Sequence, residues 1–204
     1  MDLVTLGRTL GFSFAAGVNL YATVAILGLA ARYSWVELPP QFRVFDNNLV
    51  IGVAIVMYVV EFFADKIPYV DTLWDLIHTA IRPVGGALIA VATLGNASPG
   101  VEGLVALLGG AVAAGSHLTK TSTRAVANAS PEPFSNWFLS FGEDLFVVGL
   151  GYLALRHPVV ALVVAVTMIG LIVVFAAVII RTVRRWFSRR TLESRARNLS
   201  SQDR

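Results

Sequence analysis

The chain has 204 residues, of which 56% are apolar and 14% charged, and its mean hydropathy is +0.70. Soluble domains average about 45–50% apolar and about 25% charged residues. The composition therefore argues against a soluble enzyme, a disordered chain or a fibrous repeat, and favours an integral membrane protein whose surface faces lipid. Cysteine is absent and the three histidines form no metal-binding signature, so we expect no cofactor and no metal site.

The formal charge of +3 is unevenly distributed along the chain. Residues 181–204 contain eight arginines and two acids, a charge of +6, so the remaining residues carry −3. This pattern predicts a single transmembrane domain over residues 1–182, followed by a basic, disordered cytoplasmic tail over 183–204. Arginine clusters beside a membrane span are typical of contact with anionic lipid headgroups, and we expect no nucleic-acid partner.

Charge-free apolar runs predict an all-α, polytopic membrane protein with six transmembrane helices. The first run, Thr9 to Ala31, is longer than the hydrophobic region of a secretory signal and is interpreted as a retained span. Between the second and third spans, apolar residues recur at helical spacing and indicate an amphipathic helix. In chain order the predicted segments are 9–31, 47–66, 66–82 (the amphipathic helix), 83–97, 103–125, 134–155 and 158–182.

The positively charged residues predict the orientation of this domain. With six spans, 13 Lys and Arg residues lie on the side of the two termini and three lie on the other side. Because cytoplasmic loops carry the excess of positive charge, both termini are expected in the cytoplasm. The positions of Trp35, Trp137 and Trp186 near predicted interfaces indicate membrane anchoring.

A short internal similarity suggests two halves, 1–100 and 101–182. Residues 15–20 resemble residues 113–118, which places Asn19 and His117 at corresponding positions. Three spans per half would insert the halves upside down, as in inverted-repeat transporters. Chance is the alternative, because small residues recur in membrane helices for packing alone; pairs such as Gly85-Gly86 and Gly109-Gly110 indicate close packing, within the chain or in a homo-oligomer.

Polar and ionisable residues form ordered stripes inside the predicted spans. Each stripe repeats at three- or four-residue intervals, so its members share one helix face. Because a charge in the bilayer centre is costly, these faces are expected to turn inward and meet one another. The candidate site residues are Asn19, Glu61, Asp65, Asp71, Asp75, Arg82, His117, Lys120, Arg124, Asn136, Ser140, Glu143 and Asp144.

Two interpretations of this cluster compete. As a functional site, its carboxylates carry a proton or cation, with Lys120, Arg124 and Arg82 as counter-charges or as an anion clamp. Because adjacent carboxylates repel, one of Glu143 and Asp144 is expected to hold a proton. The stripes and the amphipathic helix together contain six acidic and four basic side chains, so two positive charges are missing. Protonated histidines could supply these charges.

The first interpretation predicts a small transporter or permease-like protein that moves a proton, an ion or a small solute. The alternative is a non-transporting structural or assembly protein whose charges are ion pairs between helices. A weaker third interpretation is an enzyme acting on lipid phosphate through His117 and Lys120, although no phosphate loop or Ser-His-Asp spacing is present.

The polar motifs resemble one known family. Glu61-Phe-Phe-Ala-Asp65-Lys66-Ile-Pro68-Tyr-Val-Asp71, with Asp75, Arg82-Pro83 and the stripes around His117 and Glu143, is similar to the bacterial multi-pass family called domain of unknown function 4126. The similarity covers residues 10 to 180, and the family tends to have Asn-Pro where this chain has Asn136-Trp137. The resemblance implies a small protein of the bacterial inner membrane and names no activity.

Overall fold

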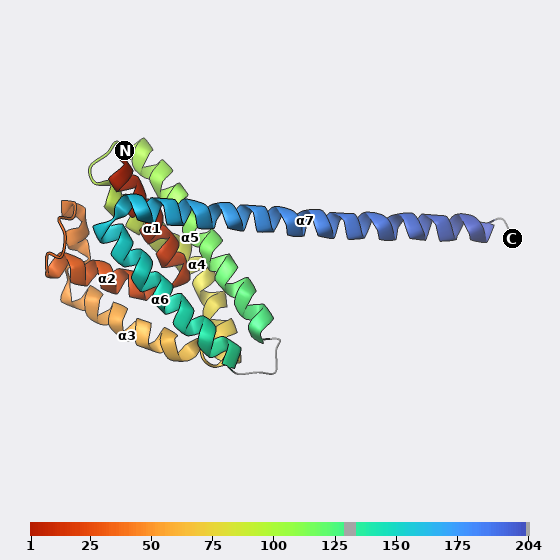
Figure 1. The fold of residues 1–204 in the computed structure, drawn as a ribbon, viewed down its shortest axis with the longest axis horizontal. Coiled ribbons are helices and arrows are strands. Elements are labelled where there is room, and N and C mark those ends of the chain that lie inside the picture. The colour runs from red at the N-terminus through yellow and green to blue at the C-terminus, as the bar shows by residue number, and fades with distance from the viewer. Residues whose placement is uncertain (129–133, 203–204) are drawn as a thin grey trace. The chain divides into compact units, whose positions relative to one another are not determined.

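The computed structural model describes the backbone of residues 1–128 and 134–202, and the side chains of residues 68, 183 and 186–202 lie outside the description. Over these ranges the chain is all-α and contains no strand, as predicted (Figure 1). The chain divides into two units, residues 1–169 and 170–204. The elements are α1 (Leu3–Val18), α2 (Leu20–Arg32), the 3₁₀ helix η1 (Pro40–Val44), α3 (Asn48–Ala64), α4 (Pro68–Leu94), α5 (Pro99–Asn128), α6 (Phe134–Arg156) and α7 (Pro158–Gln202).

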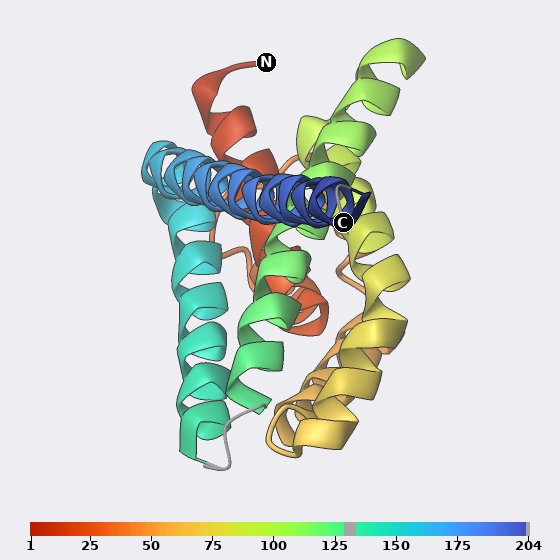
Figure 2. The ribbon, with the colours of Figure 1, turned by 90° about the vertical axis from the view of Figure 1, so that its right-hand side faces the viewer.

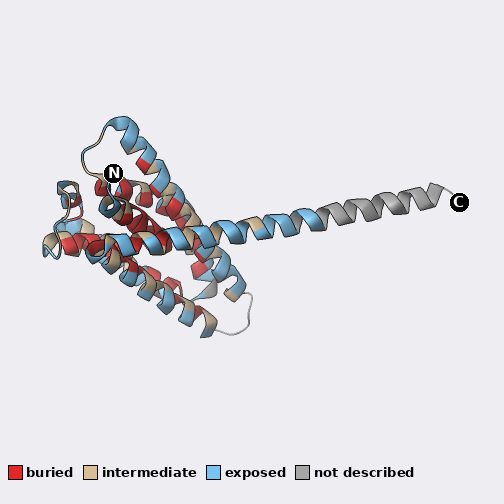
Figure 3. Cartoon of the chain, turned by 45° about the horizontal axis from the view of Figure 1, so that its top comes forward, coloured by how far each residue is buried: buried red, intermediate tan, exposed pale blue. Residues whose placement is uncertain are grey.

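Four of the described helices are long and apolar enough to cross a membrane. They cover Tyr69–Leu94, Pro99–Asn128, Phe134–Arg156 and Pro158–Thr182. The apolar helices α1, α2 and α3 are shorter than the roughly 20 residues that a bilayer core requires. Large apolar side chains such as Leu104, Leu107 and Phe138 remain exposed, which suits a surface solvated by lipid. Figure 3 shows exposed residues alternating with buried ones along the helices.

The first predicted span, 9–31, is wrong as a single helix because the chain breaks at Asn19. This residue is extended, with φ −147° and ψ 101°, and separates α1 from α2. The Asn19 side-chain oxygen accepts a hydrogen bond from the Ala22 N–H at 2.9 Å and thereby caps α2. Asparagine favours such caps because its side chain satisfies a helix-end donor that would otherwise have no partner.

The amphipathic helix 66–82 and the span 83–97 are not separate segments, which corrects the sequence prediction. They form the single helix α4, with Pro83 in its interior. An interior proline removes one backbone hydrogen bond and costs about 3 kcal/mol. Close packing of the next turn offsets this cost, since a side chain at Gly85 or Gly86 would collide with α2 or α5, respectively.

The other predicted boundaries agree more closely with the structure. The sequence does not decide whether 119–133 is a helix or a loop. Residues 119–128 belong to α5, and residues 129–133 lie outside the description. Asn136 and Trp137 are the third and fourth residues of α6. The helix α7 continues to Gln202, through most of the predicted disordered tail. Trp35 and Trp137 are exposed, as membrane anchors would be, and the Trp186 side chain lies outside the description.

The helix α1 lies at the centre of the first unit. It packs against α4, α5 and α6, while α2 packs on α3 (Figure 2). Every residue from Thr9 to Val18 is buried. A helix that is buried on all sides needs small residues where its neighbours approach. The sequence supplies Gly11, Ala15, Ala16 and Gly17 in this stretch.

The proposed similarity between residues 15–20 and 113–118 is not matched by the backbone. The first segment contains the break at Asn19, whereas His117 lies within the continuous helix α5. Equivalent positions in two repeats should share a local conformation, so the structure does not confirm an inverted repeat.

The crossing of α4 and α5 depends on glycines, and it gives a direct prediction. A Cβ atom at Gly109 would meet the Ala90 side chain, the Gly86 carbonyl oxygen at 2.8 Å and the Ser13 hydroxyl at 2.9 Å. We expect Gly109→Ala to lower the free energy of unfolding in detergent by about 1–3 kcal/mol, because the helices must separate.

Gly103→Ala on the same helix is the control, since its Cβ would meet nothing within 4 Å. Gain of helix propensity should leave that variant unchanged or slightly more stable. Equal stabilities of the two variants would contradict the packing assigned to Gly109.

Candidate functional site

The helix α4 presents one fully buried polar face. Asp71, Asp75, His78 and Arg82 follow one another at intervals of four, three and four residues, and all four are buried. At 3.6 residues per turn these intervals place the side chains on one side of the helix. The amphipathic pattern read from the sequence was therefore correct. Of the two placements that the sequence allows for this helix, at the membrane interface or within the protein, its polar face takes the second.

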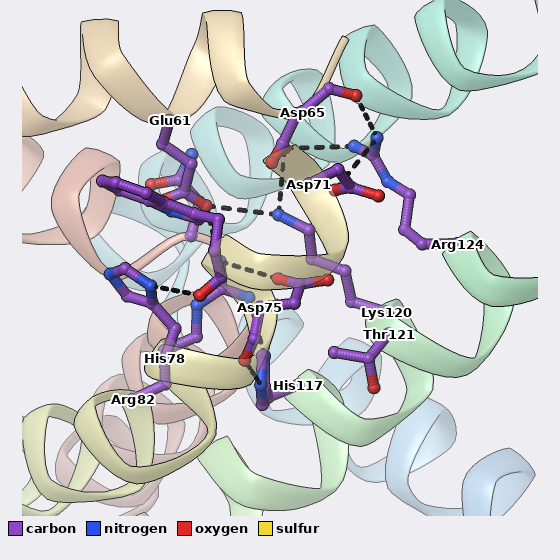
Figure 4. A network of polar contacts seen from close by, with 12 residues as sticks. Glu61, Asp65, Asp71, Asp75, His78, Arg82, His117, Lys120, Thr121 and Arg124 are labelled. Atoms are coloured by element: carbon purple, nitrogen blue, oxygen red, sulfur yellow. Dashed lines mark hydrogen bonds and ion pairs between the residues drawn. The ribbon is translucent and has the colours of Figure 1, made fainter. Parts of the chain in front are cut away.

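Three other helices bring their charges to the same place. The helix α3 ends in Glu61 and Asp65, α5 carries Lys120 and Arg124, and α6 carries Glu143 (Figure 4). Ion pairs connect all of these residues to the face of α4. We call this group the ion-pair network, and its members are Glu61, Asp65, Asp71, Asp75, Arg82, Lys120, Arg124 and Glu143.

Lys120 lies at the centre of the ion-pair network. Its Nζ is 3.2 Å from Glu61 Oε1, 3.0 Å from Asp65 Oδ2 and 3.6 Å from Glu143 Oε2. The three carboxylates come from α3 and α6, so the single ammonium group joins both helices to α5. Only 2% of the Lys120 side chain is exposed, and solvent screening of these pairs is weak at that depth.

Arg124 lies one turn further along α5, and all three nitrogen atoms of its guanidinium donate hydrogen bonds. Its Nε and Nη2 donate to the two oxygens of Glu143 at 3.1 and 2.5 Å, a bidentate pair. Its Nη2 also donates to Asp65 Oδ2 at 3.1 Å and its Nη1 to the Asp65 carbonyl at 2.7 Å. Asp71 Oδ1 lies at the longer distance of 3.7 Å from Nη1.

Arg82 connects the end of α1, beside the break at Asn19, to the rest of the ion-pair network. Its Nη2 donates to Glu61 Oε1 at 2.6 Å and lies 3.6 Å from Asp75 Oδ1. Its Nη1 donates to the Gly17 carbonyl at 3.1 Å. That carbonyl belongs to the last turn of α1, where the break at Asn19 leaves carbonyls without helical partners. A buried arginine therefore satisfies the end of a helix inside the protein.

The contacts of His117 identify its protonation state in this arrangement. Arg82 Nη1 is 2.8 Å from Nδ1 and can only donate, so Nδ1 accepts. Nε2 then carries the proton and faces the Asp75 carbonyl at 3.2 Å and the Thr79 hydroxyl at 3.1 Å. His117 is therefore neutral here. It does not supply the positive charge that the sequence analysis considered for it.

His78, on α4, connects the buried polar face of this helix to Tyr21 of α2. Its Nδ1 is 2.7 Å from the Trp74 carbonyl and its Nε2 is 2.8 Å from the Tyr21 hydroxyl. The carbonyl requires a proton on Nδ1, and Tyr21 can then donate to Nε2. Sequence reasoning missed Tyr21 and Thr79. Thr79 is one turn beyond Asp75 on α4 and could have been found by spacing, whereas Tyr21 gave no such signal.

The remaining candidate residues lie around the ion-pair network. The Asn19 amide donates to Asp144 Oδ1 at 3.3 Å, so α6 also contacts the helix break. Ser140 accepts from Lys66 Nζ at 3.3 Å, and this ammonium lies 3.1 Å from the centre of the Phe62 ring. Asn136 is not an ion-pair ligand. It donates to Asn128 at 2.5 Å, and Asn128 in turn donates to Asp71 Oδ2 at 3.0 Å, within the described residues.

The charges of the ion-pair network do not balance. It contains five carboxylates and three bases, a formal charge of −2 when every group is ionised. Among the described residues, four carboxylate oxygens of the ion-pair network are buried without a hydrogen-bond donor: Glu61 Oε2, Asp65 Oδ1, Asp71 Oδ1 and Asp75 Oδ1. Unneutralised charge is unstable away from water. The arrangement is therefore suited to taking up protons or a cation.

Two cavities reach the ion-pair network from opposite faces of α5. The α4–α5 cavity has a volume of about 410 Å³ and is lined by Asp71, Asp75 and Arg124. The α1–α6 cavity has a volume of about 320 Å³ and is lined by Lys120 and Glu143. The α5 residues of the first are 121, 122, 124, 125 and 128, and those of the second are 116, 119, 120 and 123. At 100° per residue these two sets point in opposite directions.

The described residues offer little for a metal ion. Across residues 1–128 and 134–202 as far as their side chains are described, no group of three or more His, Asp or Glu side chains is arranged to hold one. The acids of the ion-pair network instead face lysine and arginine.

Comparison with known proteins identifies the family. No curated protein and no solved structure showed a significant match. The family model described as "Domain of unknown function (DUF4126)" matches residues 6–178, which include every residue of the ion-pair network and both cavities. The resemblance noted in the acidic and basic stripes is thus confirmed over most of the chain, and the protein belongs to the DUF4126 family of proteins with unknown function.

Proposed function

We propose that the protein is a small membrane transporter in which the ion-pair network carries protons during solute movement. The observation that carries this proposal is the position of the network between two cavities on opposite faces of α5. Lys120 lines one cavity and Arg124 the other, and both share Asp65 and Glu143 as partners. A proton or charge shift within these pairs would therefore alter both cavities.

The helix break at Asn19 supports the same proposal. Transporters place discontinuous helices at their binding sites, because free helix ends offer carbonyls and N–H groups without a side-chain charge. Here the Gly17 carbonyl contacts Arg82, and the Asn19 amide contacts Asp144. The break thus lies against the charges rather than in a peripheral loop.

The membrane topology is part of the proposal. The start of α1 and the end of α2 lie on the same side of the first unit, because the Thr9 hydroxyl is 2.8 Å from the Thr93 hydroxyl near the end of α4, and Ile26 approaches Gly151 near the end of α6. We therefore infer that α1 and α2 enter and leave the membrane on one side and that α3, α4, α5, α6 and α7 cross it, five crossings in place of the six expected from the sequence. Five crossings place the two termini on opposite sides, and the eight arginines of residues 181–204 favour the cytoplasm of a bacterial inner membrane for the C-terminus. The basic C-terminal segment would then contact anionic lipid headgroups.

Proton movement in vesicles tests the proposal. Purified protein is reconstituted into vesicles that contain the pH dye pyranine, and a potassium gradient with valinomycin imposes the membrane potential. We expect proton uptake above that of protein-free vesicles, and loss of this uptake in Glu143→Gln. The amide keeps the shape of the side chain but cannot exchange a proton or balance Arg124 and Lys120.

Glu102→Gln on α5 is the matched control, because Glu102 lies in the first turn of that helix and outside the ion-pair network. It should conduct like the unmodified protein. Absence of proton movement at either sign of the potential, together with a large stability loss in Glu143→Gln, would instead favour the structural interpretation of the charges. Both ring nitrogens of His117 have partners within the protein, which speaks against its attack on a lipid phosphate.

A further inference from the structure

The surplus negative charge of the ion-pair network is concentrated on α4. Glu61, Asp65 and Glu143 each have a base within 3.2 Å. Asp71 and Asp75 reach a base only at 3.7 and 3.6 Å, respectively. Coulomb attraction falls with distance and a hydrogen bond is lost beyond about 3.5 Å, so these two carboxylates are the least neutralised.

Both of these carboxylates line the α4–α5 cavity. Asp71 is fully buried and Asp75 is 5% exposed, and the Oδ1 atom of each is buried without a hydrogen-bond donor. Figure 4 shows the two side chains directed from α4 toward α5, where Thr121 and Arg124 lie. These Oδ1 atoms face Arg124 and Arg82, so a ligand N–H group in the cavity would meet the accessible part of the Asp75 side chain, which is 7% exposed. The fully buried Asp71 would act on the ligand through its charge.

The other walls of the α4–α5 cavity define the rest of the ligand. Thr72, Thr79, Thr121 and Ser122 contribute hydroxyl groups, and Leu76 and Ala125 contribute apolar surface. The volume of about 410 Å³ lies within the usual range for small-molecule sites. It accommodates an organic group in addition to a charged one. Carboxylates and hydroxyls accept hydrogen bonds from an ammonium group. Arg124 also lines the cavity, but Glu143 and Asp65 already neutralise its guanidinium, so Asp71 and Asp75 set the local charge and would repel an anion.

We propose that the α4–α5 cavity is the substrate site and binds a small organic cation, an alkylammonium compound, with its N–H groups directed to the Asp75 carboxylate and its charge also attracted by Asp71. This inference rests on the proposed transport function and adds the substrate class. The formal charge of −2 links the two, because the cation and the protons would neutralise the same carboxylates. Binding of the cation would thus displace protons from the ion-pair network.

Three isosteric probes test the ligand class by titration calorimetry of the purified protein in detergent. We expect saturable binding of n-butylammonium, and none of n-butanol or n-butyrate at the same concentrations. Asp75→Asn should weaken n-butylammonium binding by about tenfold or more, the usual effect of losing a charged hydrogen-bond partner. Preferred binding of butyrate, or unchanged binding in Asp75→Asn, would overturn the proposal.

A pair of variants on α5 tests the location without altering a charge. Ala125→Phe fills the cavity and should abolish n-butylammonium binding. Val126→Phe places the same ring at the neighbouring position, which is 75% exposed and outside the cavity lining. This variant should bind n-butylammonium normally. Equal binding by both variants would contradict the assigned site even if Asp75→Asn did not fold.

The two proposals fail in distinguishable ways. Proton uptake in the vesicle experiment without n-butylammonium binding would leave transport standing and overturn the substrate class. Binding without any proton movement would support the site and overturn proton coupling. If both proposals hold, an outward gradient of n-butylammonium should drive proton uptake beyond the acidification that escape of neutral n-butylamine causes in protein-free vesicles, and Ala125→Phe should remove this excess.

Discussion

Replacement of Arg124 by methionine is expected to lower the free energy of unfolding by about 3–5 kcal/mol, the usual effect of removing one partner from a buried ion pair. Methionine is long and apolar, so it fills much of the same space. The loss would instead come from Glu143, which forfeits a bidentate partner, and from Asp65, which forfeits donors to its carboxylate and its carbonyl. Thermal or denaturant unfolding in detergent, followed by circular dichroism, measures the change.

The matched control is Arg32→Met. Arg32 pairs with Asp46 at 2.9 Å, but the two side chains are 30% and 37% exposed. Exposed pairs contribute about 0–1 kcal/mol, so this variant should remain close to the unmodified protein. A second substitution, Glu143→Gln in the Arg124→Met background, should recover part of the stability by removing the unpaired charge. Similar losses for Arg124→Met and Arg32→Met would show that the ion-pair network is not the buried structure described here.

Replacement of Arg82 should have a comparable effect for a different reason. Arg82 joins Glu61 of α3, the Gly17 carbonyl of α1 and His117 of α5 through two nitrogen atoms. We expect Arg82→Met to cost about 3–5 kcal/mol, because Glu61 and the end of α1 lose their donor. The measurement is again unfolding in detergent.

Arg82→Lys separates charge from geometry. Lysine keeps the positive charge but has a single nitrogen, which cannot reach all three partners of the planar guanidinium. We expect Arg82→Lys to retain the charge-dependent part of the stability and to lose about 1–3 kcal/mol from the missing hydrogen bonds. Full stability of Arg82→Lys would indicate that the fork-shaped contacts at the helix break contribute nothing.

Spacing along the sequence was sufficient to identify most of the buried charges. The intervals of His117, Lys120 and Arg124 on one helix, and of Asp71, Asp75, His78 and Arg82 on another, predicted shared faces, and the structure places all seven residues in the interior. The prediction succeeded because a regular helix fixes the direction of each side chain. A charged face that cannot remain in lipid must turn toward another polar face.

The same reasoning failed at the two places where tertiary contacts override local pattern. The run 9–31 has no charge and reads as one helix, yet it breaks at Asn19, whose cap on α2 and contact with Asp144 offset the lost backbone bonds. Pro83 reads as a helix boundary, yet α4 continues through it. The next turn, at Gly85 and Gly86, packs closely against α2 and α5, and this packing offsets the backbone hydrogen bond that Pro83 removes.

The sequence by itself determined that this is an all-α membrane protein and which side chains must avoid lipid, because composition and helical period act within one segment at a time. Only the tertiary structure decided which base meets which acid, that His117 is neutral beside Arg82, and that Asp71 and Asp75 are left least neutralised at a cavity wall. Such pairings depend on distances of a few ångströms between residues far apart in the chain. Helix packing sets those distances, since Coulomb and hydrogen-bond energies change steeply over that range.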